Sequence, residues 1–99
     1  MSQKLSPSQI KALRAQAHNL NPIVTIGQNG VTESVIAELD RSLEHHELLK
    51  VKIAIGDREV RKLIAEDLIK QSQSTLIQSI GKTLILYRKA QKAKIPSPA

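Results

Sequence analysis

The chain has 99 residues, of which 40% are apolar and 24% are charged, and its formal net charge is +6. This length and composition are typical of one small globular domain, which has little apolar material to spare for a deep catalytic cleft. Because cysteine is absent, disulfides, cysteine-zinc sites and thiol catalysis are excluded, and a cytoplasmic location is expected. No apolar run reaches the ~18 residues of a transmembrane helix, so we expect no membrane partner.

The first predicted element is a helix from about Pro7 to His18. Ser6 can cap it, proline occupies its first position, and Gln9 follows the cap by three residues. Its buried side is expected to consist of residues at helical spacing, Ile10, Leu13 and Ala17. The segment from Asn19 to Pro22 then ends the helix.

A strand, a glycine loop and a second helix follow. Residues 23–26 are all β-branched and predict a strand that ends at Gly27. Thr32 can cap the second helix, which should extend to about His45. The apolar stripe of this helix is expected at Val35, Ile36, Leu39 and Leu43.

Residues 49–55 alternate between apolar and polar side chains, which predicts a half-buried strand. Its lysines, Lys50 and Lys52, should point away from the core on one exposed strip. The side chains that should face the core are Leu49, Val51 and Ile53. Asp57 can cap a third helix that extends to about Gln71. The inner stripe of that helix is expected at Val60, Leu63, Ile64 and Leu68.

A β-hairpin ends the predicted domain. Its strands, residues 75–80 and 83–88, should be joined by a two-residue turn at Gly81-Lys82, with glycine in the first position. The expected register pairs Gln78 with Ile85 and Leu76 with Tyr87.

The element order α-β-α-β-α-β-β predicts an α/β fold, a single small domain with a four-stranded mixed sheet. Right-handed crossovers should make the first three strands parallel, and the hairpin should make the last one antiparallel. This domain is expected to occupy residues 1–89. Residues 90–99 contain two lysines and two prolines and are expected to form a basic, flexible C-terminal tail.

The charged residues are segregated along the chain. All nine acidic residues lie between Glu33 and Asp67, whereas nine of the 15 lysines and arginines lie outside that window. A surface built from the two ends of the chain would therefore attract a polyanion. The alternative interpretation is a charged face that simply contacts solvent.

The loop Gly27-Gln28-Asn29-Gly30 is the sharpest candidate site. Its amides precede a helix N-terminus, where free N–H groups and the helix dipole attract phosphate. The alternative is a tight turn between strand and helix, for which Asn29-Gly30 is a common dipeptide. Because the loop has neither a third glycine nor a Gly-Lys-Ser/Thr ending, a free nucleotide or other small-molecule substrate is not expected.

A second group of candidate contacts is cationic. Its members are Lys50, Lys52, Lys82, Arg88 and Lys89. Exposed lysines on strands also protect sheet edges from aggregation, which is the alternative interpretation of this group. Tyr87 is the only aromatic residue, so base stacking is not the main mode of recognition, and contact with the nucleic-acid backbone is favoured.

No pattern in the chain indicates an enzyme, a cofactor or a metal. His45 and His46 are adjacent in a predicted helix and would point about 100° apart, which suits a helix C-terminus better than a metal site. We find no combination of residues typical of nucleophilic or acid-base catalysis.

The segments Pro22–Ile53 and Ile80–Arg88 together resemble the CRM domain (chloroplast RNA splicing and ribosome maturation), in particular its stand-alone bacterial form of the YhbY type. The resemblance extends from Leu5 to about Lys89. It implies an RNA-binding domain whose fold is similar to the C-terminal domain of translation initiation factor three and which associates with precursors of the large ribosomal subunit.

In that family the presumed RNA contacts are the GxxG loop and the nearby basic surface, which here means residues 27–30, with Thr32 beside them. Many relatives place a lysine or arginine in the loop, whereas Gln28 and Asn29 are neutral. The contact should therefore depend more on main-chain amides and on cations elsewhere.

Two functions are predicted from these observations. The first is an RNA-binding factor that contacts structured ribosomal RNA and assists assembly of the large subunit. The alternative is a protein-interaction module that docks on a ribosomal protein or assembly factor through acidic helical residues. The candidates for that surface are Glu38, Glu44, Glu66 and Asp67.

Overall fold

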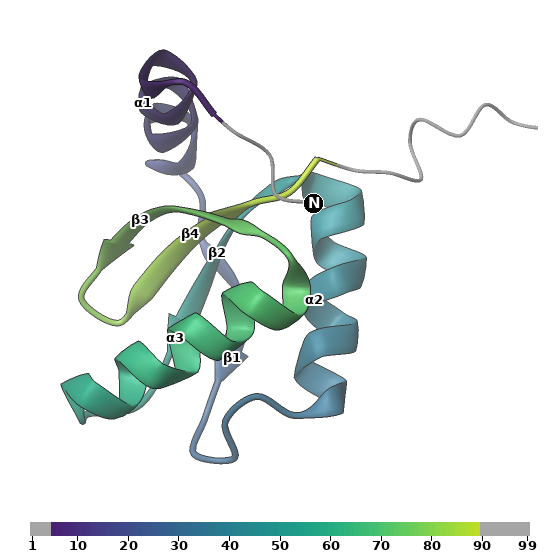
Figure 1. Ribbon diagram of the computed structural model, residues 1–99, viewed down its shortest axis with the longest axis vertical. Coiled ribbons are helices and arrows are strands. Elements are labelled where there is room, and N and C mark those ends of the chain that lie inside the picture. Colours follow the sequence, from purple (N-terminus) through teal and green to yellow (C-terminus); the bar gives the residue numbers. More distant parts are fainter. Residues whose placement is uncertain (1–4, 90–99) are drawn as a thin grey trace, which may run out of the picture.

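The computed structural model describes residues 5–89 (Figure 1). The elements follow the predicted order: α1 (Pro7–Ala17), β1 (Pro22–Ile26), α2 (Glu33–His46), β2 (Leu48–Ile53), α3 (Arg58–Ser72), β3 (Thr75–Ile80) and β4 (Thr83–Tyr87). The tail expected at residues 90–99 lies outside the described residues.

The strands form one four-stranded sheet in the order β1-β2-β4-β3. β1 and β2 are parallel, and β4 is antiparallel to both of its neighbours. The first three strands therefore run in one direction and β4 in the other, as the crossover argument predicts. Because β4 is inserted between β2 and β3, it occupies the centre of the sheet and β3 forms an edge.

Helices cover both faces of the sheet. α2 and α3 pack on one face, where Val24, Val51, Leu86 and their neighbours form the main core. α1 packs on the other face, where Ala17 contacts a smaller cluster that includes Leu48. Because consecutive strand residues point to opposite faces, the adjacent leucines of β2, Leu48 and Leu49, serve different clusters.

The predicted caps are present at all three helices. Ser6 and Gln9 form a reciprocal capping box at α1. The Thr32 hydroxyl accepts a hydrogen bond from the Val35 amide at 3.2 Å. The Asp57 carboxylate accepts from the first amides of α3. Local side-chain chemistry therefore determines where each helix begins.

The prediction for the inner side of α3 is wrong at two positions. Val60 and Leu63 are 41% and 66% exposed, respectively. The inward side of the first turn is instead occupied by Arg61, whose guanidinium donates to the carbonyls of Ile55 and Gly56, both at 2.8 Å. The apolar residues that pack on the core from α3 are Ile64, Ala65, Leu68 and Ile69.

The predicted hairpin register is correct near the turn and wrong farther from it. Gln78 pairs with Ile85 as expected, but Leu76 pairs with Leu86 rather than with Tyr87. The register shifts between Leu76 and Gln78 because β3 contains one extra residue there, a β-bulge.

Candidate nucleic-acid interface

The GxxG loop is a tight turn with an exposed tip. The Gly30 amide donates to the Gly27 carbonyl at 3.0 Å, which closes the turn. Gly30 has a φ of +71°, a conformation that glycine adopts without strain. Gln28 and Asn29 are exposed at the tip. The turn interpretation is thus correct for the backbone, and it leaves the tip accessible to a partner.

Main-chain donors remain available on this loop. Among residues 5–89, no acceptor takes a hydrogen bond from the amides of Gln28 or Asn29. Farther along, Thr32 satisfies the amide of Val35 at the start of α2, and Glu33 places a negative charge in the first turn of that helix. The donors most accessible to an anion are therefore those at the tip of the loop.

Main-chain hydrogen bonds connect the loop to the neighbouring chain segments. The Ala54 amide donates to the Ile26 carbonyl at 2.8 Å, and the Ile53 amide donates to the Lys82 carbonyl at 2.7 Å. Residues 27–30, 54–57 and 81–82 consequently lie along one end of the sheet, which we call the glycine-loop end (Figure 1).

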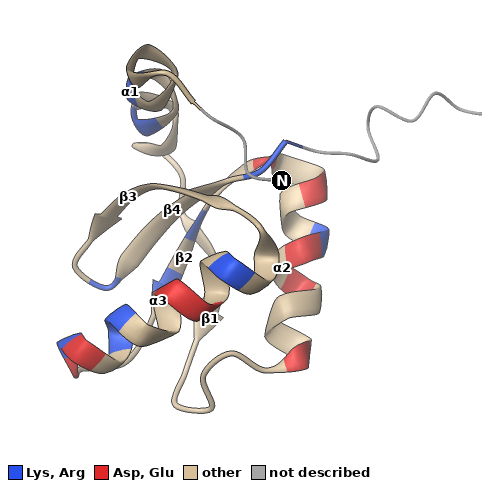
Figure 2. Cartoon of the chain, viewed as in Figure 1, with Lys and Arg blue, Asp and Glu red and all other residues tan. Residues whose placement is uncertain are grey.

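Three exposed cations lie at or beside the glycine-loop end (Figure 2). Lys52 pairs with Thr25 of β1, and the next pair, Ile26 with Ile53, directly precedes the loop. Lys82 is in the hairpin turn, and Arg58 is the first residue of α3. The fold thus brings Lys52 and Lys82 to the same end of the sheet as the loop, which a shared binding surface requires.

Arg58 was missed as a candidate contact. A signal was present, since α3 begins directly after β2, and β2 is parallel to β1. The start of α3 must therefore lie at the same end of the sheet as the GxxG loop.

Lys50 lies farther from the loop and is half-buried. Its Nζ atom donates to the His18 carbonyl at 3.5 Å, at the end of α1. Lys50 and Lys52 do share one face of β2, as predicted, but only Lys52 is fully exposed.

Arg88 lies at the opposite end of the sheet and has an internal role. Its guanidinium pairs with Asp40 at 2.7 Å and with Glu44 at 3.1 Å. It also donates to the main-chain carbonyls of Ser72 and Asp40. The Arg88 side chain is only 13% exposed, and its contacts connect the end of β4 to both α2 and α3. Lys89, next to Arg88, is exposed, but like Arg88 it lies at the end of the sheet opposite the GxxG loop.

Acidic residues lie on both α2 and α3, and one of them, Glu59, follows Arg58 directly (Figure 2). Of the residues expected to form an acidic docking surface, Glu44 is engaged with Arg88, while Glu38, Glu66 and Asp67 are exposed. Thr32, predicted beside the loop, is half-buried and caps α2.

No cluster of three or more potential ligands that could hold a metal ion occurs within residues 5–89. His45 and His46 lie in the last turn of α2 with their rings edge to face. None of the helices in the same described part is long and apolar enough to cross a bilayer.

The chain belongs to the CRS1/YhbY (CRM) domain family, whose sequence profile matches residues 5–88. It is similar to a Haemophilus influenzae protein named as an RNA-binding protein, with 46% identity over 95% of each chain. It is also 44% identical to a Pseudomonas aeruginosa protein named "Probable RNA-binding protein PA4753", over 89% of this chain and 85% of that one.

A solved relative has the same fold. The solution structure of a Staphylococcus aureus protein, described as a hypothetical protein and candidate RNA-binding protein, superposes with a TM-score of 0.77 at 36% identity. The match covers 92% of this chain and 95% of that one. None of these three relatives carries the name of an enzyme.

Proposed function

We propose that this protein binds structured ribosomal RNA through the glycine-loop end of its sheet and assists assembly of the large ribosomal subunit. The observation that carries the proposal is the coincidence, at one end of the sheet, of exposed loop amides with Lys52, Lys82 and Arg58. Membership of the CRM family and the names of the relatives support RNA as the polyanion.

The proposed contact is made mainly with the sugar-phosphate backbone. The amides of Gln28 and Asn29 donate to a phosphate oxygen, and their side-chain amides can reach phosphate or a ribose 2′-hydroxyl. Lys52, Lys82 and Arg58 add cationic contacts that release counterions from the RNA. The only phenylalanine, tyrosine or tryptophan, Tyr87, is half-buried on the α1 face, so none of these larger rings offers a base an exposed stacking surface within residues 5–89.

On this proposal the protein acts by binding alone and performs no chemistry on the RNA. The neutral loop tip requires nearby cations for affinity, because main-chain amides supply direction but no net charge. The protein would work in the cytoplasm, where bacterial ribosomes are assembled.

The test is a titration of the protein with a fragment of large-subunit ribosomal RNA at increasing salt concentration. Phosphate contacts should give a linear fall of log affinity with log salt, with a slope of about −0.7 to −0.9 per neutralised phosphate. In cells, the protein should crosslink to ribosomal RNA and co-sediment with large-subunit precursors.

A flat salt dependence, or co-sedimentation that survives ribonuclease, would contradict the proposal. Those outcomes would favour docking on a protein through the exposed acidic residues Glu38, Glu66 and Asp67.

A further inference from the structure

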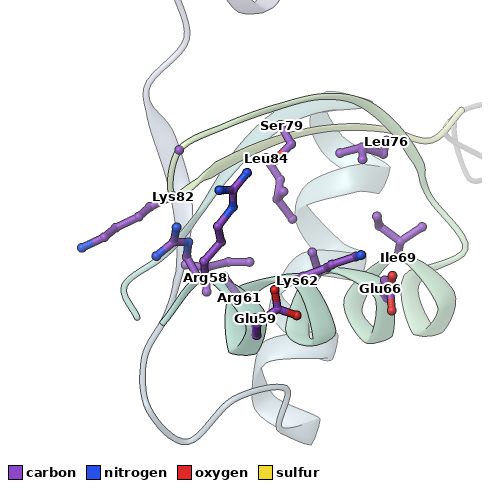
Figure 3. A pocket seen from close by; sticks show the side chains of 13 residues that line it. Arg58, Glu59, Arg61, Lys62, Glu66, Ile69, Leu76, Ser79, Lys82 and Leu84 are labelled. Atoms are coloured by element: carbon purple, nitrogen blue, oxygen red, sulfur yellow. The ribbon is translucent and has the colours of Figure 1, made fainter. Parts of the chain in front are cut away.

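An open groove lies between α3 and the β3–β4 hairpin, with a volume of about 800 Å³ (Figure 3). Its floor is apolar and consists of Ile53, Ala65, Ile69, Leu76 and Leu84. The groove is open because α3 packs on β2 and α2, whereas β3 is the edge strand and is separated from β2 by β4.

Leu76 shows the consequence of this arrangement. It pairs with the fully buried Leu86 and so belongs to the face of the sheet that α2 and α3 cover. Nevertheless Leu76 is 41% exposed, because no part of α3 lies over it closely enough to exclude water. An apolar side chain from a partner would gain contact with Leu76 and Ile69 at this end of the groove.

The edge strand beside the groove has unpaired main-chain groups. β3 has the sequence TLIQSI, without a charge or a proline, although such residues usually protect the edges of natural sheets. Within residues 5–89, nothing hydrogen-bonds to the outer edge of β3. An extended peptide that pairs with such an edge gains main-chain hydrogen bonds and places alternate side chains into the adjacent groove.

Charge on the rim indicates which peptide fits. Arg58, Lys62 and Lys82 lie on the rim, and in Figure 3 Arg58 and Lys82 stand at the hairpin-turn end. Glu59 and Glu66 also line the groove, so the excess of positive charge is concentrated near the turn. Arg61 is already engaged with main-chain carbonyls.

No aromatic side chain lines the groove, so a flipped-out base would have no stacking surface there. We therefore propose that the groove and the outer edge of β3 bind an extended segment of a partner protein whose groove-facing side chains are apolar at one end and acidic at the other. The segment adds to the sheet beside β3. Its groove-facing apolar side chains contact Ile69 and Leu76, and its groove-facing carboxylates, nearer the hairpin turn, meet Arg58, Lys62 and Lys82. This site is distinct from the tip of the GxxG loop.

The experiment uses a synthetic eight-residue peptide that carries isoleucine at two alternate positions, glutamate at the next two and threonine between them, in both sequence orders. It is compared with the same peptide carrying lysine in place of glutamate. Binding is followed by fluorescence anisotropy and by amide NMR shifts of the labelled full-length protein. We expect the acidic peptide to bind at least tenfold more tightly than the basic one, with the largest shifts in β3 and α3. Only every second peptide nitrogen donates to β3. N-methylation of those nitrogens should abolish binding, and N-methylation of the intervening nitrogens should not.

Matched variants separate this site from the RNA site. Leu76→Asp should weaken peptide binding at least tenfold and leave RNA affinity unchanged. Leu63→Asp, on α3 but outside the groove, should change neither, since that side chain is 66% exposed. Conversely, Gln28→Asp/Asn29→Asp should weaken RNA binding and leave the peptide affinity intact.

The proposal is overturned if neither peptide binds below about 1 mM, if both bind equally, or if Leu63→Asp weakens binding as much as Leu76→Asp. It is also overturned if a short oligoribonucleotide, rather than the acidic peptide, shifts the amides of Ile69 and Leu76, which lie outside the proposed RNA interface. Sedimentation of the protein alone as a dimer that Leu76→Asp disrupts would instead identify a second copy as the occupant.

Discussion

The two ends of the sheet use cationic residues in opposite ways. At the glycine-loop end, Lys52, Lys82 and Arg58 are exposed beside a loop whose tip amides have no acceptor in the described part of the chain. At the other end, Arg88 is 13% exposed and is held by two carboxylates from α2 and by main-chain carbonyls.

This comparison shows that a cation is available to a partner only when neighbouring carboxylates leave it free. The acidic residues of α2 neutralise Arg88, whereas none of the three exposed cations has an ion pair within residues 5–89. Net charge therefore predicts the kind of partner, while the local ion pairs decide where that partner contacts the protein.

The largest expected effect comes from Arg88→Ala at the far end. The change removes two ion pairs and two hydrogen bonds to carbonyls, and we expect a loss of about 3 kcal/mol in the free energy of unfolding. The Asp40 side chain is half-exposed, so its carboxylate can be hydrated again once Arg88 is removed. The expected loss of unfolding free energy is therefore at the low end of the range for broken buried ion pairs. Urea denaturation measures the loss, with exposed Lys89→Ala as the control, for which a change within about 0.5 kcal/mol is expected.

A loss of RNA affinity in folded Arg88→Ala, without a loss of stability, would contradict the assignment of Arg88 to the interior.

The next effect concerns the loop. Gln28→Asp/Asn29→Asp places two carboxylates beside the proposed phosphate, at a cost of about 2 kcal/mol, or about thirty-fold in RNA affinity. Both side chains are exposed, so the unfolding free energy should change little. Fluorescence anisotropy with a labelled RNA fragment measures the affinity, and Gln28→Ala/Asn29→Ala separates added repulsion from lost side-chain contacts. Equal affinity of the aspartate variant and the unchanged protein would remove the loop from the interface.

The two loop glycines should respond differently to alanine. Gly30→Ala forces a side chain into a positive-φ conformation and should cost about 1 kcal/mol of stability. Gly27→Ala meets no atom within 4 Å and needs no positive φ, so its stability should be nearly unchanged. Thermal unfolding compares the two. If Gly27→Ala weakens RNA binding at constant stability, the RNA backbone approaches the loop closely at that glycine.

The smallest effects come from single cations. Lys52→Ala, Lys82→Ala and Arg58→Ala should each weaken RNA binding several-fold and reduce the steepness of the log affinity versus log salt plot by about 0.7 to 0.9. Lys89→Ala should leave that slope unchanged if the interface is confined to the glycine-loop end. Salt titrations of the four variants provide the comparison, and an equal effect of Lys89→Ala would extend the interface to the far end.

Much of the fold could be predicted because local chemistry determines it. The caps at Ser6, Thr32 and Asp57 set the helix starts, and alternation in β2 separates core residues from exposed ones. The insertion of β4 between β2 and β3 could not be read from local patterns, since it depends on which strand edges meet. The bulge in β3, which displaces Leu76 from Tyr87, is likewise a property of the paired strands.

The candidate site shows the same limit. The GxxG loop was recognisable because its glycines stand between a strand and a capped helix. The role of Arg88 was not, because its partners on α2 are separated from it by more than forty positions in the chain. Arg58 could have been placed at the loop end from the parallel β1 and β2, but its proximity to the hairpin turn depends on the strand order.

An NMR titration tests most directly whether RNA contacts the glycine-loop end. Labelled full-length protein is titrated with a hairpin from large-subunit ribosomal RNA, and the amide signals are followed at low salt. We expect the largest shifts at Gln28, Asn29, Lys52 and Lys82, with small changes around Asp40 and Lys89. Shifts concentrated on the acidic surface of α2 or at the Arg88 end, with the loop amides unchanged, would contradict the proposed interface.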